Sequence, residues 1–160
     1  MADGRTHGTV TVILATAGGL LCTAFTGNLA ECAVASAGCL FGLVCDPDLD
    51  QPGITRAEGR LLGGKLWMLG IVWFAIWYPY ARLIPHRHML SHWPIVGTGG
   101  RLLYLSFIGL LAFWFLQQIL PGAAASLSHA LRQVPSNFIS WFVFGLVASD
   151  TAHWLFDGRP

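Results

Sequence analysis

The stretch PHRHMLSHWP, residues 85–94, is the starting point for predicting the fold of this 160-residue chain. It places three histidines and an arginine within a few residues of one another, in a sequence that is otherwise mostly apolar. Imidazole is a common ligand for borderline metals, and carboxylates often complete its shell. Carboxylates gather in two other segments, Asp46–Asp50 and Asp150–Asp157. We expect all three segments to meet at one metal site.

The composition is typical of a membrane protein. Hydrophobic residues make up 54% of the chain and charged residues only 11%, whereas a soluble domain has roughly 25% charged residues. The length allows one domain, so residues 1–160 are expected to form a single integral membrane domain with the lipid bilayer as its main partner. A net charge of +1 without a basic stripe gives no reason to expect nucleic-acid binding.

Apolar runs follow one another along the chain. The first two are rich in Ala and Gly, which suits close helix packing in a bilayer and would also permit contacts between subunits of a homo-oligomer. A third run, 66–84, is strongly aromatic and is interrupted by Pro79. The expected transmembrane spans are about 8–26, 29–45, 102–120 and 138–156.

The aromatic run decides between two topologies. If 66–84 crosses the membrane, the chain has five spans, and Asp48 and His86 fall on opposite faces. If it lies in the interface or re-enters, four spans remain, and His7, both aspartate segments and the histidine stretch share one face. Tryptophan and tyrosine concentrate at membrane interfaces, which favours the second arrangement.

Basic residues test the topology independently. With four spans only Arg132 lies on the face opposite the site, whereas five spans split the basic residues almost evenly. The positive-inside rule then places the site on the cytoplasmic face of an inner or plasma membrane. We therefore predict an all-α membrane protein with about four transmembrane helices and an interfacial or re-entrant segment. The basic residues on the site face would be Arg5, Arg56, Arg60, Lys65, Arg82, Arg87, Arg101 and Arg159.

The last apolar run carries Asp150, His153 and Asp157, whose spacing places them on one face of a helix. An unpaired carboxylate at Asp150, inside the run, would cost several kcal/mol. A metal ion or a histidine partner removes that cost. A helix end with polar groups reaching the interface is the alternative, and it suits Asp157 better than Asp150.

The other two segments complete a metal shell. Asp48 and Asp50 are separated by one residue, so both carboxylates point to the same side of an extended segment, where they repel each other unless a cation lies between them. His86 and His92 supply imidazoles, and Arg87 suits a phosphate or carboxylate group of a ligand. The alternative for the histidine stretch is a basic loop that contacts anionic lipid.

A shell of aspartate and histidine without thiolate suits a divalent metal, zinc first, with manganese, iron or magnesium as alternatives. The candidates exceed the four ligands of a closed structural zinc site, which suggests two ions or an open catalytic position. The four cysteines lie in or at the end of apolar runs, and we expect small buried side chains rather than disulfides. The candidate metal ligands are His7, Asp48, Asp50, His86, His92, Asp150, His153 and Asp157.

Four groups of residues carry a resemblance to a known family. They are Gly4-Arg5-Thr6-His7; Pro47-Asp48-Leu49-Asp50; Pro85-His86-Arg87…Ser91-His92 with Gly97-Thr98…Arg101; and Asp150…His153-Trp154…Asp157. Together they resemble a family of metal-binding integral membrane proteins of unknown function. That family is similar to the LexA-binding, inner-membrane-associated proteins described as hydrolases. The resemblance spans nearly the whole chain, supports His7 as a ligand and implies hydrolase chemistry, although His88 and Trp93 depart from the hydrolase pattern.

The leading hypothesis is a metal-dependent hydrolase of a phosphoester or lipid headgroup, with Arg87 binding the anion and a spare carboxylate acting as base. The alternative is a non-enzymatic scaffold or assembly protein of a membrane complex, in which the metal staples the helices together. A metal transporter fits less well, because the ligands gather at one face and not along a path at mid-membrane.

Overall fold

The computed structural model of this chain is helical throughout the part that it describes. It describes residues 4–51, 53–55, 58–59, 62–65, 67–86 and 88–157, with side chains from residue 6 onward. Those ranges contain seven α-helices, one 3₁₀ helix and no strand. The elements are α1 (Gly4–Thr26), α2 (Leu29–Phe41), η1 (Pro47–Asp50), α4 (Trp67–Leu83), α5 (Met89–His92), α6 (Pro94–Ile119), α7 (Pro121–Arg132) and α8 (Ser136–Phe156).

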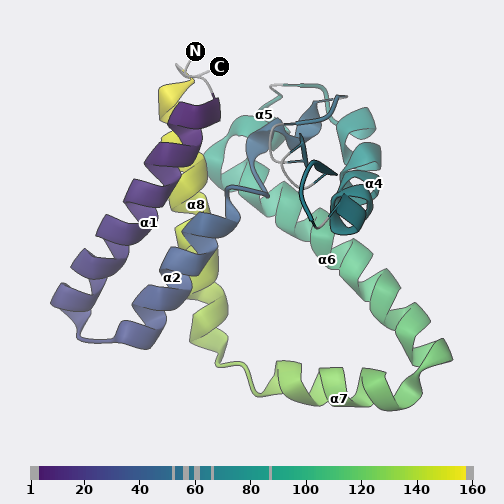
Figure 1. Cartoon of the computed structure of the whole chain (residues 1–160). Coiled ribbons are helices and arrows are strands. Elements are labelled where there is room, and N and C mark those ends of the chain that lie inside the picture. The colour runs from purple at the N-terminus through teal and green to yellow at the C-terminus, as the bar shows by residue number, and fades with distance from the viewer. Residues whose placement is uncertain are drawn as a thin grey trace.

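Helices α1, α2 and α8 form a bundle in which the backbones approach closely (Figure 1). A Cβ added at Gly145 of α8 would lie 1.8 Å from the carbonyl oxygen of Ala35, and one at Gly38 of α2 would lie 2.0 Å from that of Phe142. Only glycine fits at such distances. The small residues of the first apolar runs therefore serve close helix packing, as the sequence predicts.

The start of α1 and the end of α8 lie side by side at one end of this bundle (Figure 1). From that end α6 runs away to the opposite end, where α7 connects it to the start of α8 (Figure 1). The segment Pro121–Arg132, between the last two apolar runs, is a helix. This path brings the start of α1, the start of α6 and the end of α8 to one end of the molecule.

Helix α4 packs against the aspartate segment. Its Trp77 and Tyr80 are buried together with Cys45 and Leu49, on either side of the turn into η1. The indole of Trp73 donates a hydrogen bond to the carbonyl of Val44, 3.2 Å away. The predicted aromatic segment is thus a helix, and its rings hold η1 and its carboxylates in place.

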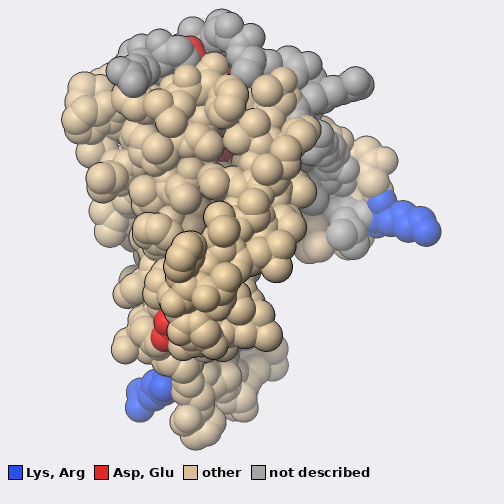
Figure 2. Space-filling model, turned by 90° about the vertical axis from the view of Figure 1, so that its left-hand side faces the viewer, with Lys and Arg blue, Asp and Glu red and all other residues tan. Residues whose placement is uncertain are grey.

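Two helices within the described ranges are long and apolar enough to cross a membrane, Thr6–Thr26 and Pro94–Ile119; Leu29–Phe41 is apolar but shorter. Their apolar side chains are widely exposed, and Figure 2 shows a broad face with few charged side chains. Four transmembrane helices were expected, and two meet this criterion. The second run is helical only to Phe41 and not to Cys45, and Asp150 and His153 lower the mean hydropathy of α8.

One expectation about the cysteines is wrong. Cys22 and Cys32 form a disulfide between α1 and α2, with their Cα atoms 5.7 Å apart. The turn between these helices is short because Gly27 adopts the left-handed backbone conformation, with φ of 68°. The last turns of α1 therefore lie beside the first turns of α2. Cys39 and Cys45 are free and buried, as expected.

Candidate metal centre

Seven of the eight predicted ligands come together at the end of the bundle that holds the start of α1 and the end of α8. They form three groups in which the ligand atoms lie within 4.8 Å of one another. His153 belongs to two groups and so does His92, which makes the whole set one continuous cluster. The groups are His7–His153–Asp157, Asp48–His92–His153 and Asp50–His86–His92.

The central group has the geometry expected of metal ligands. The Nε2 atoms of His92 and His153 lie 3.8 and 3.9 Å from the same oxygen, Oδ1 of Asp48. Those distances are too long for hydrogen bonds, yet two ligands each about 2 Å from one ion can span them. Neither nitrogen is exposed, and neither has a hydrogen-bond partner among the described residues. These buried nitrogens make no hydrogen bond within the described residues and face carboxylate oxygens, so they fit a divalent ion.

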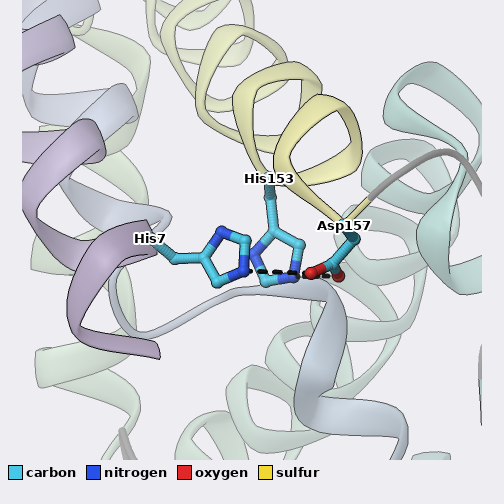
Figure 3. Close-up of side chains that lie close together, drawn as sticks. All are labelled: His7, His153 and Asp157. Atoms are coloured by element: carbon cyan, nitrogen blue, oxygen red, sulfur yellow. Dashed lines mark hydrogen bonds and ion pairs between the residues drawn. The ribbon is translucent and has the colours of Figure 1, made fainter. Parts of the chain in front are cut away.

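The second group extends the cluster toward α1 (Figure 3). Asp157 lies 3.2 Å from Nε2 of His153 and 3.0 Å from Nε2 of His7, and the two imidazole rings stack with their centres 4.0 Å apart. Asp48 and Asp157 thus approach the same nitrogen of His153. Because one nitrogen ligates one ion, these two groups would share an ion, with Asp157 as a further ligand or as the partner of His7.

The third group is built around Asp50, whose side chain is fully buried. It accepts a hydrogen bond from the Ser91 hydroxyl at 2.6 Å and lies 2.7 Å from Nδ1 of His86. Oδ2 of Asp50, the oxygen that accepts from Ser91, also lies 3.4 Å from Nδ1 of His92, and the Ser91 hydroxyl oxygen lies 3.0 Å from the same nitrogen. Because Nδ1 of His92 faces Asp50, Nε2 is left to face the central group. A carboxylate commonly orients a metal-binding imidazole in this way.

The electrostatics of the cluster favour a bound cation. Burial opposes ionisation of Asp48, but interactions with His92 and His153 outweigh it and lower the pKa of Asp48 to about 2. Burial also opposes charge on His92, but Asp48 and Asp50 outweigh it and raise the pKa of His92 to about 9. Without metal, the aspartates therefore hold a proton on His92, which is the position that a metal ion would take over.

A family match agrees with this chemistry. The family model described as "Uncharacterized metal-binding protein (DUF2227)" matches residues 2–160. The chain belongs to this family. No curated protein and no solved structure gives a match. The chain is thus a metal-binding protein, and the cluster of aspartates and histidines contains the side chains suited to hold the ion.

Asp150, the eighth predicted ligand of this metal-binding protein, lies outside the three groups that its described residues form. Its Oδ2 instead pairs with the buried guanidinium of Arg101 and accepts a hydrogen bond from Thr98. Arg101 also donates to the carbonyl of Ser91, 2.8 Å away. The pair therefore links α8 to α6 and to the α5 turn that carries His92.

Sequence reasoning gave Thr98 and Arg101 no role beyond the family resemblance. The available signal was their spacing, three residues apart at the start of an otherwise apolar helix, which places both on one helix face. The predicted anion-binding residue, Arg87, lies outside the described residues. Its part in the site remains a prediction.

A cavity of about 250 Å³ adjoins the cluster. His7, Asp48 and His153 line one part of it, and the rest includes Asp46, Thr11, Ser149 and Asp150. Oδ1 of Asp46 and Oδ1 of Asp150 are buried without hydrogen-bond partners in the part of the chain that the structure describes. Burial, followed by the charge of Asp48, raises the pKa of Asp46 to about 8. In the absence of a bound ion this carboxyl group therefore keeps its proton at neutral pH.

Proposed function

We propose that this metal-binding protein is an integral membrane hydrolase that cleaves a phosphoester, such as a lipid headgroup, at the cytoplasmic face. The observation that carries the proposal is the cavity beside His7, Asp48 and His153, because it gives a substrate access to the residues that would hold the metal. A structural metal site is normally closed by its ligands, whereas a catalytic site keeps a position open. The likeness to the LexA-binding family described as hydrolases points the same way.

The proposal gives five residues of the site a role in binding the metal and the phosphate. Asp48, His92 and His153 hold the ion, zinc by the choice of ligands, and Asp50 orients the His92 ring. A divalent ion in that place supplies a Lewis acid and lowers the pKa of a coordinated water. Arg87 binds the phosphate group.

The hydrolysis reaction uses no other reactant than water. The water oxygen forms the new bond to phosphorus, and the bond between phosphorus and the leaving alcohol oxygen breaks. Asp46, on the cavity wall, donates a proton to the leaving oxygen. The proton released by the attacking water returns to Asp46, so that its carboxyl group is protonated again for the next cycle.

In the membrane arrangement that we propose, α1, α2, α6 and α8 cross the bilayer and α4 lies at the interface. The exposed apolar side chains of α6 support this, among them Leu103 at 74% and Leu110 at 69% exposure. The pairing of Asp150 with Arg101 offsets the charge that α8 would carry into the bilayer.

The disulfide supports the orientation. Cys22 and Cys32 join α1 to α2 beside the turn at Gly27, at the end of the bundle remote from the start of α1, the end of α8 and the metal centre (Figure 1). Disulfides form in oxidising compartments and are rare in the cytosol. This chemistry supports an arrangement with the disulfide end outside the cytoplasm and the metal centre facing inward, in agreement with the positive-inside argument.

The second candidate is a scaffold in which the metal is structural. The observation in its favour is that the candidate ligands come from α1, η1, α5, α8 and the segment before α5, so one ion would tie these elements together. In that case the protein binds metal but leaves phosphoesters intact.

The test uses zinc-loaded protein in detergent with 4-methylumbelliferyl phosphate as substrate. We expect turnover by the wild type and its loss in His92→Gln. The matched control is His129→Gln, an exposed histidine on α7, which should keep both metal and activity. Wild-type protein that binds metal without hydrolysing this or a diester substrate would contradict the hydrolase proposal and favour the scaffold.

A further inference from the structure

A second cavity runs along the same three helices as the first. It has a volume of about 390 Å³ and lies between α1, α2 and α8. Its walls are mostly small or apolar, including Leu14, Gly18, Trp141 and Phe144. Phe144 is 63% exposed, so the groove is bordered by a side chain that faces the surroundings of the bundle.

This groove lies beyond the polar cavity along α1 and α8, on the other side of the contact between Thr11 and Ser149. Thr11 and Ser149 line the polar cavity, and their hydroxyl oxygens lie 3.3 Å apart. Ala15, one helical turn beyond Thr11, and Ala148, next to Ser149, line the groove. The two spaces therefore follow each other along α1 and α8, the first polar and the second apolar.

The polar side chains on the groove wall donate hydrogen bonds to backbone carbonyls of α1. Ser36 donates its hydroxyl hydrogen bond to the carbonyl of Ala15 at 2.9 Å. The thiol of Cys39 donates to the carbonyl of Thr11 at 3.7 Å. These donors are engaged with α1, so the groove offers its occupant a lining suited to methylene groups.

We propose that the substrate is a lipid with a phosphoester headgroup, whose acyl or alkyl chain lies in this groove while the headgroup occupies the polar cavity. The inference rests on the proposed hydrolase function and adds the substrate class. A chain lying between α1 and α8 would hold the phosphoester at the metal centre, because the boundary at Thr11 and Ser149 fixes where the polar part begins.

Gly18 offers a way to fill the groove without disturbing the helices. A Cβ added there meets no atom within 4 Å, and the same holds for Gly109 on α6, away from the groove. Gly18→Leu and Gly109→Leu are therefore the same chemical change at two equally open positions. Only the first adds a side chain to the groove.

The probe is hexadecyl phosphate with a diazirine at the end of its alkyl chain, added to zinc-loaded protein in detergent. In the wild type we expect photolabelling to concentrate within residues 14–22 and 141–148. Gly18→Leu should lower that labelling, and the hydrolysis of hexadecyl phosphate, by about tenfold, a moderate steric loss. Gly109→Leu should change neither. Both variants should hydrolyse the chain-free 4-methylumbelliferyl phosphate as the wild type does.

The proposal that the alkyl chain lies in the groove would be wrong if α6 were labelled as densely as the groove. If 4-methylumbelliferyl phosphate were still cleaved, the hydrolase proposal would stand. Absence of cleavage of both phosphates would overturn the hydrolase proposal and this inference with it. The wild-type labelling map needs no variant, so it decides the question even if Gly18→Leu fails to fold.

Discussion

The two ends of the helix bundle differ in how far their polar side chains are buried. At the end with the metal centre, Asp50, Asp150 and His92 are almost completely buried and depend on partners from several elements. At the other end, Asn137 donates an exposed hydrogen bond to Glu31, and a disulfide joins two neighbouring helices. Burying charge is costly unless it is paired. The comparison teaches that one end is built to hold a ligand and the other to hold helices together.

The largest effect should follow from breaking the buried pair that supports the metal end. Arg101→Met leaves Asp150 buried without its cation, which should cost about 3–5 kcal/mol of stability. Thermal or denaturant unfolding in detergent measures it. The double variant Arg101→Met/Asp150→Leu should recover most of the loss, because it removes both charges. A single variant as stable as the wild type would show that the pair does not support this end.

Removing the disulfide tests the opposite end. Cys22→Ser should lower stability by about 2–3 kcal/mol, the value expected for a short closed loop. Zinc content should stay unchanged, because the disulfide lies at the far end of α1 from His7. Unfolding and elemental analysis of the same sample check both points, and reduction of the wild type should reproduce the shift. Loss of zinc would contradict the separation between the two ends.

A change in the residue that orients His92 should weaken zinc binding without abolishing it. Asp50→Asn keeps the size of the side chain but removes the negative charge that faces Nδ1 of His92. We expect zinc affinity to fall about 10–100-fold, the usual effect of altering such a supporting group. Competition with a chelator measures the affinity. A complete loss of binding would instead make Asp50 a direct ligand.

The last prediction in this series concerns pH, where the expected change is about tenfold per unit. In the metal-free protein the pKa of His92 is raised to about 9, and a histidine must lose its proton to ligate. Zinc affinity should therefore rise by about tenfold per pH unit up to that pKa and level off above it. Titrations from neutral to alkaline pH test this. In Asp50→Asn the plateau should begin at lower pH, because one of the charges that raise the pKa is gone.

Much of this arrangement was predictable because polar residues are rare in the chain. The topology argument could bring His7, Asp48, His92 and His153 to one end, since each lies near the boundary of an apolar run. The partner of Asp150 could not be predicted, because Arg101 lies 49 residues away and meets it only through the packing of α6 on α8.

Two other features needed three-dimensional information. The disulfide depends on a turn short enough to place Cys22 beside Cys32, and the cysteine spacing alone does not indicate this. Which nitrogen of His92 faces the central group follows only from the position of Asp50 against the opposite side of the ring. The apolar groove likewise arises where three helices meet, and the linear sequence carries no pattern for it.

The central claim is that Asp48 and His153, which lie far apart in the sequence, hold the same metal ion. The most direct test is the metal content of purified protein, measured by elemental mass spectrometry for the wild type, Asp48→Ala and His153→Ala. We predict bound metal in the wild type, about one ion per chain, and its loss in each variant. A wild type without metal after growth in zinc, or two variants that both keep a full complement, would contradict the account.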